Sequence, residues 1–290
     1  MMPVAEPRLH TVAVPATGRW LQMAYAEWGA ADNPEVVLCV HGLTRCGRDF
    51  DALARYLAPR FRVICPDMPG RGRSDWLPAA SDYSYPRYLN DISVLLARLQ
   101  VARVHWVGTS MGGILGMMAA AMQGHPLRSL VLNDVGMRIP AAALQQLATY
   151  VGKAPTFDSF AAITEYLARV NAGFGRLDAM QWAELARHTT REDAAGRWQV
   201  CYDPAIGAAL QDIRQDIDLE PLWRSTRLPA LIVRGVESTL LTAEIVSGMQ
   251  AIRPDVQAIT FSGCGHAPAL QSLEQLAVVA GFLSGQRSVA

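Results

Sequence analysis

Apolar residues in this chain fall into short continuous runs separated by segments of helical spacing. Six of these runs end in Gly or in polar residues: 36–42 (VVLCVHG), 62–67 (RVICPD), 104–110 (VHWVGTS), 129–135 (SLVLNDV), 228–235 (LPALIVRG) and 256–262 (VQAITFS). Continuous apolar runs of this length are typical of strands whose two faces are both covered in a parallel sheet. We therefore expect these six segments to form the centre of one sheet.

Two earlier stretches have a different pattern. Residues 10–16 (HTVAVPA) and 20–29 (WLQMAYAEWG) alternate apolar and polar positions, which predicts strands that are half buried. Helical spacing follows the later strands; the predicted helices are 49–57, 85–99, 111–122 and, at the end of the chain, 269–283. Strands that alternate with helices indicate an α/β fold with a parallel sheet and right-handed crossovers.

Residues 138–223 interrupt this alternation. Three segments there are amphipathic at helical spacing, LQQLATYVG, FAAITEYLARV and DAMQWAELARH, with Gly, Pro and Asp between them. We therefore expect a core domain made of residues 1–137 and 224–290, and a helical cap inserted between them at 138–223.

Composition narrows the class of protein. Of the 290 residues, 51% are hydrophobic and 18% are charged, which suits a globular protein with a large core. The formal net charge is zero and no basic run occurs, so nucleic acid is not an expected partner. The N-terminal MMPVAEPRLH lacks a signal-peptide pattern and no apolar run could span a bilayer, so a cytoplasmic protein without a membrane partner is expected. The five cysteines have no metal-ligand spacing, and we predict no metal site.

One strand-to-helix junction carries a nucleophile pattern. The sequence Gly108-Thr109-Ser110-Met111-Gly112 fits G-x-S-x-G, with a predicted strand before it and a Gly- and Ala-rich helix after it. Small residues two positions on either side let such a turn close around a serine in strained dihedrals. Ser110 would then stand at a helix N-terminus, where negative charge is stabilised.

A base and an oxyanion site can be assigned beside this serine. His266, in the loop SGCGHAPAL between the last strand and the last helix, can return over the carboxyl edge of the sheet to reach Ser110. The loop HGLTRCG at 41–47 follows another central strand. We expect its backbone N–H at Leu43, together with that of Met111, to hold an oxyanion.

Taken together, HGLT, DMPGRGRSD (67–75), GTSMGG and GCGHAP resemble the α/β-hydrolase superfamily and occur in its order. The resemblance implies an eight-stranded, mostly parallel sheet flanked by helices, with a cap inserted after strand six. It implies Ser110 as nucleophile, His266 as base, Leu43 and Met111 as oxyanion donors, and no cofactor. Branches with an Asp nucleophile, such as the haloalkane dehalogenases and epoxide hydrolases, are excluded by Ser110.

The third member of the triad is not settled by the resemblance. The commonest family pattern has an Asp after strand seven, where this chain has Ser238 in VRGVESTLL, and a serine cannot be the acid. A second arrangement has the acid after strand six, where this chain has Asp134. We therefore predict Asp134 as the acid and keep Glu237 as the fallback.

These residues predict a bacterial serine hydrolase of a small organic substrate, with a carboxylic ester or lactone favoured. Two alternatives stay open: a catabolic hydrolase of a C–C or amide bond with the same triad, and a small-ligand receptor with vestigial activity. Arg45, Trp182 and Trp198 are candidates for substrate contacts. The sequence leaves open whether the protein is a monomer or a homodimer.

Overall fold

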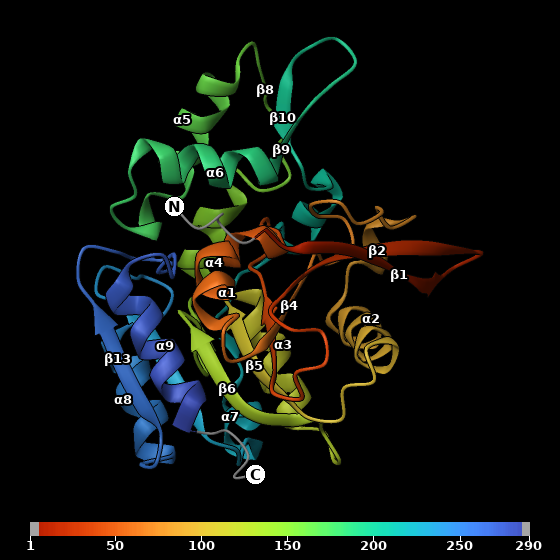
Figure 1. Ribbon diagram of the computed structural model, residues 1–290. Helices are drawn as coiled ribbons and strands as arrows, with labels where there is room; N and C mark the ends of the chain where they lie inside the picture. Colours follow the sequence, from red (N-terminus) through yellow and green to blue (C-terminus); the bar gives the residue numbers. More distant parts are fainter. Residues whose placement is uncertain (1–5, 286–290) are drawn as a thin grey trace.

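An eight-stranded sheet runs through the computed structural model, which describes residues 6–285 (Figure 1). Its strands are β1 (Arg8–Ala16), β2 (Arg19–Trp28), β3 (Val36–Val40), β4 (Arg62–Pro66), β5 (Val104–Thr109), β6 (Leu127–Asn133), β12 (Ala230–Gly235) and β13 (Gln257–Phe261). They lie in the order β1-β2-β4-β3-β5-β6-β12-β13. β2 pairs antiparallel with β1 and with β4, and the other neighbours pair parallel. The predicted mostly parallel, eight-stranded sheet is confirmed.

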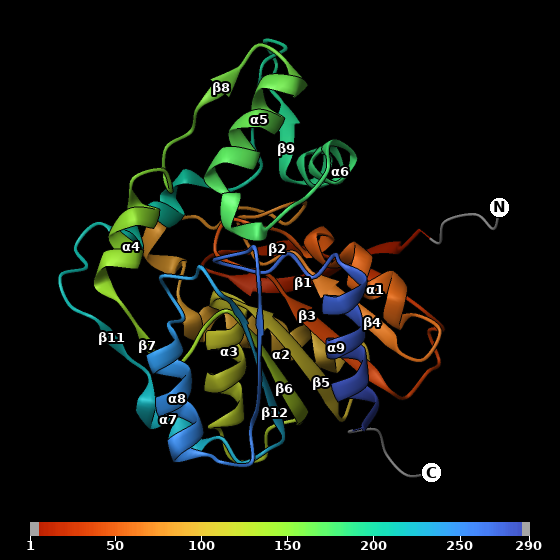
Figure 2. The ribbon, with the colours of Figure 1, turned by 90° about the vertical axis from the view of Figure 1, so that its left-hand side faces the viewer.

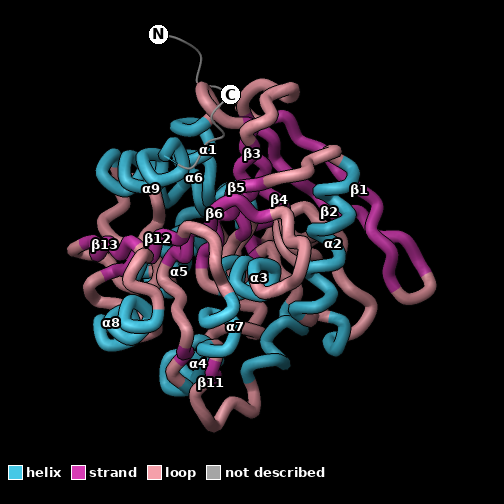
Figure 3. Tube along the Cα trace, turned by 90° about the horizontal axis from the view of Figure 1, so that it is seen from below, coloured by secondary structure: helices cyan, strands magenta, loops and turns pink. Residues whose placement is uncertain are grey.

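Helices cover both faces of this sheet (Figure 3). On one face lie α2 (Tyr85–Arg98), α3 (Met111–Ala120), α7 (Glu220–Ser225) and α8 (Ala243–Ile252). On the other lie α1 (Asp51–Leu57), which follows the 3-10 helix η1 (Gly47–Phe50), and α9 (Leu273–Gly285). In β3, Leu38 and Val40 pack toward the first face while Val37 and Cys39 pack toward the second. This alternation explains why β3 is apolar at every position and why the other central strands are mostly apolar.

The segment between β6 and β12 lies largely above the carboxyl ends of the parallel strands (Figure 2). Its elements are β7 (Arg138–Ile139), α4 (Ala141–Ala148), β8 (Thr156–Phe157), α5 (Phe160–Val170), η3 (Ala172–Phe174), α6 (Ala179–Thr189), β9 (Thr190–Glu192), β10 (Trp198–Val200), η4 (Pro204–Leu210) and β11 (Ile217–Asp218). A capping box of Asp178 and Gln181 begins α6. Ile163, Leu167 and Ala186 belong to a small apolar cluster separate from the two clusters of the sheet.

The expectation of a purely helical insert was wrong in one respect. β8, β10 and β9 form a three-stranded antiparallel sheet, and β7 pairs with β11. These strands are only two or three residues long, so an alternation of apolar and polar positions could not appear in the sequence. The division into a core and a cap at residues 138 and 223 stays a prediction, and α7, at the end of the insert, packs against α3 of the core.

The predicted ends of the chain are only partly within the structure. Residues 1–5 of the N-terminal stretch discussed above, and residues 286–290 of the predicted core domain, lie outside the described residues. Over residues 6–285, no helix combines the length and the apolar character needed to cross a bilayer. The helix α8 was not predicted, and the final helix begins at Leu273 instead of residue 269.

Candidate active site

The turn between β5 and α3 holds Ser110 in a backbone conformation that side chains rarely adopt, with φ 52° and ψ −114°. A Cβ on Gly108 would lie 2.3 Å from the backbone of Gly112, and one on Gly112 would lie 1.9 Å from the carbonyl oxygen of Val40. Both positions therefore require glycine. Because the chain turns so sharply, the Ser110 hydroxyl stands clear of the sheet at the first turn of α3.

Three side chains form a continuous relay at this turn. The Ser110 Oγ lies 3.0 Å from the Nε2 of His266, and the Nδ1 of His266 lies 2.8 Å from the Oδ2 of Asp134. A carboxylate can only accept, so Nδ1 carries the proton and Nε2 is free to accept from the serine hydroxyl. Asp134 is fully buried, whereas the His266 side chain is 21% exposed and faces the cavity described below.

Asp134 is held by further hydrogen bonds from the end of β12. The backbone N–H of Gly235 donates to its Oδ1 at 2.9 Å, and the hydroxyl of Ser238 donates to its Oδ2 at 2.5 Å. The Ser238 Oγ in turn accepts from the backbone N–H groups of Leu240 and Leu241. The loop that lacks the usual acid therefore supplies a hydroxyl that fixes the carboxylate from the neighbouring strand.

Glu237, the fallback acid, lies differently. Its side chain is exposed and lines the cavity, and its backbone N–H donates to the carbonyl of Cys264. Within residues 6–285 its carboxylate receives no hydrogen bond, and the imidazole Nδ1 of His266 is already bonded to Asp134. The geometry therefore brings Asp134, and not Glu237, together with Ser110 and His266.

Replacement of Ser238 by Ala should lower kcat with little change in KM. A hydrogen bond to a charged group contributes about 1.5–3 kcal/mol, so its loss corresponds to a reduction of roughly ten- to a hundredfold if all of it is felt in the transition state. Steady-state kinetics on any ester substrate would measure this, with Ser238→Thr, which keeps the hydroxyl, retaining most of the activity. Equal kcat values for the Ala variant and the wild type would contradict this role.

The loop after β3 faces the same space as Ser110. Leu43 lines the cavity, and its carbonyl accepts a hydrogen bond from Nε of the fully buried Arg71 at 2.8 Å. Met111 begins α3, so its backbone N–H belongs to the first helical turn, which has no intrahelical acceptor. The bond to Leu43 ties the loop after β4, which holds Arg71, to the loop after β3. Arg71 also donates to the hydroxyl of Tyr88 and to the carbonyl of Pro69.

His41 begins this loop and is buried in a neutral form. Its Nδ1 lies 2.7 Å from the carbonyl oxygen of Gly42, and its Nε2 accepts from the backbone N–H of Met68 at 2.9 Å. A proton on Nε2 would face an N–H donor. Burial lowers the pKa of His41 to about 3, and the nearby charges of Arg71 and Arg45 act in the same direction.

The low pKa of His41 predicts a loss of stability in acid. Below pH 6.5 the unfolded chain binds a proton at this residue, whereas the folded protein does not until about pH 3. Stability therefore falls as the pH falls through this window, by about 2 kcal/mol between pH 7 and pH 5 from this residue. Urea unfolding at the two pH values should show that His41→Gln lacks this contribution. An equal pH dependence for the variant and the wild type would contradict it.

A cavity of about 380 Å³ opens beside Ser110 and His266. It is lined by the loop after β3, by α4, by the end of α5 with η3, and by the His266 loop. Trp182 and Trp198 are not among its lining residues: Trp182 stacks on Phe174, which does line it, and Trp198 packs against Phe160.

The insert touches the His266 loop directly. The backbone N–H of Gly265 donates to the carbonyl of Gly173 at 2.8 Å, and a Cβ on Gly173 would lie 2.4 Å from the carbonyl oxygen of His266. The η3 segment is thus packed closely against the backbone that carries the imidazole. The insert therefore forms part of the wall around the candidate base.

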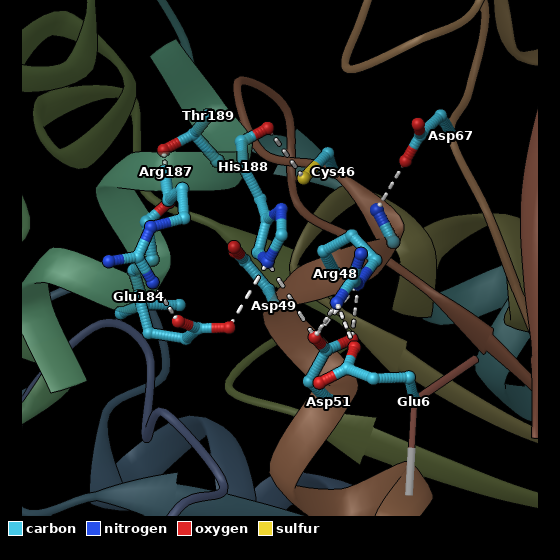
Figure 4. A network of polar contacts seen from close by, with 12 residues as sticks. Glu6, Cys46, Arg48, Asp49, Asp51, Asp67, Glu184, Arg187, His188 and Thr189 are labelled. Carbon is cyan, nitrogen blue, oxygen red and sulfur yellow. Dashed lines mark hydrogen bonds and ion pairs between the residues drawn. The ribbon is translucent and has the colours of Figure 1, made fainter. Parts of the chain in front are cut away.

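A second polar cluster joins α6 to the start of α1 (Figure 4). In the part of the chain that the structure describes, Asp51, Glu184 and His188 have ligand atoms within 4.8 Å of one another, a spacing that could hold a metal ion. Arg48, however, donates to both oxygens of Asp51 at 2.8 Å and its Nη2 lies 2.6 Å from Oδ2. Arg48 thus already places a positive charge beside Asp51, and the cluster forms a polar contact between α6 and α1.

Two residues that support the site were missed from the sequence. Ser238 was rejected as an acid, and its role as a donor to Asp134 depends on a contact between residues 104 positions apart. Arg71 lies in DMPGRGRSD, which predicted a tight loop, but nothing in the motif indicated which of its charged side chains is buried. Asp67 of the same motif braces the loops by accepting the backbone N–H groups of Gly47 and Arg73.

Several known proteins with similar sequences and structures are hydrolases. The chain is 39% identical over 290 residues to a 3-hydroxybutyrate-oligomer hydrolase of Cupriavidus necator, covering 97% of this chain and 99% of that one. It is 28% identical over 232 residues to a 2-(acetamidomethylene)succinate hydrolase of Mesorhizobium japonicum, covering 80% and 81% of the two chains. An α/β hydrolase of Novosphingobium aromaticivorans superposes with a TM-score of 0.85 at 32% identity, covering 97% and 99%.

Residues 35–273 match the family described as the α/β hydrolase fold. This match covers the sheet from β3 onward, the elbow and the His266 loop. With the relatives above, it shows that the chain is an enzyme that carries out hydrolysis, and the chain belongs to the α/β-hydrolase family.

Proposed function

We propose that the protein is a serine hydrolase in which Ser110, His266 and Asp134 form the catalytic triad. The observation that carries this proposal is the relay of hydrogen bonds from the Ser110 Oγ through the imidazole to the buried carboxylate, at the edge of a cavity. His266 takes the proton of the hydroxyl as it attacks an acyl carbon, and Asp134 stabilises the imidazolium that forms.

The oxyanion of the tetrahedral intermediate is held by the backbone N–H groups of Leu43 and Met111. The imidazolium of His266 then protonates the leaving alcohol, which departs and leaves an acyl group on Ser110. A water molecule, deprotonated by the same imidazole, attacks the acyl carbon and releases the acid. Each step uses only the side chains and backbone groups of the site.

The substrate we propose is an ester of a short hydroxy acid, such as an oligomer of 3-hydroxybutyrate. This is the substrate in the name of the relative that is 39% identical over nearly the whole length of both chains. The cavity suits a small ester, since one wall is apolar, with Ala143 and Leu147 of α4 and Val151 just after it, while Thr44 and Asn171 are polar. A volume of about 380 Å³ is in the range of sites for small molecules.

The test is hydrolysis of the dimer and trimer of 3-hydroxybutyrate, followed by chromatography of the released acid. We expect turnover by the wild type and none above background by Ser110→Ala, with circular dichroism showing that the variant is folded. Hydrolysis of p-nitrophenyl butyrate without hydrolysis of the oligomers would keep the triad but reject this substrate. Labelling of Ser110 by a phosphonate probe with no turnover of any ester, amide or diketone would favour a receptor.

A further inference from the structure

Some charged side chains of the cavity wall are paired with an opposite charge, and others are not. Arg45 and Asp49 both line the cavity, but they form a closed pair, with the Nε of Arg45 2.6 Å from Oδ2 and its Nη2 2.8 Å from Oδ1 of Asp49. Arg45 is also buried, with its guanidinium over the ring of Phe174. Arg45, which the sequence offered as a substrate contact, is therefore already paired with the carboxylate of Asp49.

Arg169 is in a different position. It lies in the last turn of α5 and lines the same cavity, with an exposed side chain. Its guanidinium lies over the ring of Tyr166, 5.7 Å from the centroid, and that ring packs against Phe157. Within residues 6–285, Arg169 forms no ion pair with an Asp or Glu. The wall thus contains a cation held against an aromatic ring and without an acidic partner.

The other exposed charge of the wall has the opposite sign and comes from the core. Glu237 precedes Ser238 in the loop after β12, close to the backbone of Gly265 in the His266 loop. An anionic substrate would be repelled there and attracted to Arg169 on the insert. The two charges therefore favour one orientation of a substrate that has a carboxylate at one end.

We propose that Arg169 binds the free carboxylate of the substrate, so that the enzyme selects anionic esters over neutral ones. This inference rests on the proposed ester hydrolase function and names its substrate class: acyl esters that carry a terminal carboxylate. A guanidinium can bind a carboxylate through two parallel N–H donors, which gives both attraction and orientation. The stacking on Tyr166 limits the rotamers of Arg169 and lowers the entropy lost on binding.

The experiment compares an anionic and a neutral substrate of the same shape. The 3-hydroxybutyrate dimer and its methyl ester share the scissile ester, and they differ in the charge of the terminal carboxyl group. The measured quantity is the ratio of kcat/KM for the dimer to kcat/KM for hydrolysis of the same internal ester in the methyl ester. Arg169→Gln should lower this ratio about tenfold, as expected for one charge-assisted contact, and Arg169→Lys should restore part of it.

Arg176→Gln is the matched control, because Arg176 is an exposed arginine of the insert that does not line the cavity. It should leave the ratio unchanged. In the wild type, added salt should lower the ratio, because it screens an exposed charge pair.

The two proposals fail in different ways. An unchanged ratio in Arg169→Gln, or an equal fall in Arg176→Gln, overturns the inference while both esters are still hydrolysed. A wild type that hydrolyses neither ester overturns the proposed function, and the inference with it.

Discussion

Replacing Asp134 by Asn should lower kcat by about 10⁴-fold, the loss that the same change causes in serine proteases. In this protein the reason is visible in the hydrogen bonds: Oδ2 of Asp134 accepts from both the Nδ1 of His266 and the hydroxyl of Ser238. An amide in that place would favour the wrong tautomer of His266 and would not stabilise the imidazolium. Steady-state kinetics of p-nitrophenyl butyrate hydrolysis measures the loss of kcat. A urea unfolding curve checks that the variant is still folded.

Glu237→Gln is the matched control for this variant, since Glu237 also lines the cavity next to the His266 loop. Its kcat should stay within a few fold of the wild type, because its charge contributes only at a distance through solvent. If Glu237→Gln lost activity and Asp134→Asn kept it, the acid would be Glu237 and the loop after β12 would have to rearrange during catalysis.

Replacing Gly112 by Ala should destabilise the protein by about 3 kcal/mol or more, because overpacking against backbone cannot be relieved by a change of rotamer. The new Cβ would lie 1.9 Å from the carbonyl oxygen of Val40 and 3.1 Å from that of His41. The start of α3 would have to move away from the loop after β3. Since Met111 lies between Ser110 and Gly112, kcat should fall as well. Thermal and urea unfolding measure the first effect.

Gly281→Ala provides a control of opposite sign. Gly281 lies inside α9, and a Cβ there would meet no atom within 4 Å. Alanine is the better helix former, so this variant should be more stable than the wild type by about 0.5–1 kcal/mol. A Gly112→Ala protein as stable as the wild type would mean that the packing at the elbow is looser than the structure describes.

The strands of the sheet could be predicted from sequence because the burial of a strand shows in its own residues. A strand covered on both faces is apolar along most of its length, as β3, β4, β5, β6 and β12 are. The sixth run, β13, forms an edge of the sheet and not its centre, and most of its residues are not buried. The short strands of the insert escaped prediction because β8 and β10 are too brief to have a period. β8 pairs with β10 across α5, η3, α6 and β9, so their pairing depends on the fold of the whole insert.

One part of the candidate site could likewise be predicted from the sequence, and another part could not. Ser110 and His266 stand in motifs whose glycines are needed by the backbone itself, so short stretches of sequence were enough to single them out. The partners of Asp134 are decided by tertiary contacts, whereas the partner of Arg45 is local. Asp49, four residues from Arg45, removes the cation that the sequence offered to a substrate, and Arg169 reaches the cavity only through the fold of the insert.

The central claim, that Ser110 is a nucleophile activated through His266 by Asp134, is tested most directly with a fluorophosphonate probe. Peptide mass spectrometry would locate the adduct, and the labelling rate would be compared among the wild type, Asp134→Asn and Glu237→Gln. The account predicts one adduct, on Ser110, formed at a near wild-type rate in Glu237→Gln and orders of magnitude more slowly in Asp134→Asn. An adduct on another residue, no adduct, or slow labelling in Glu237→Gln alone would contradict it.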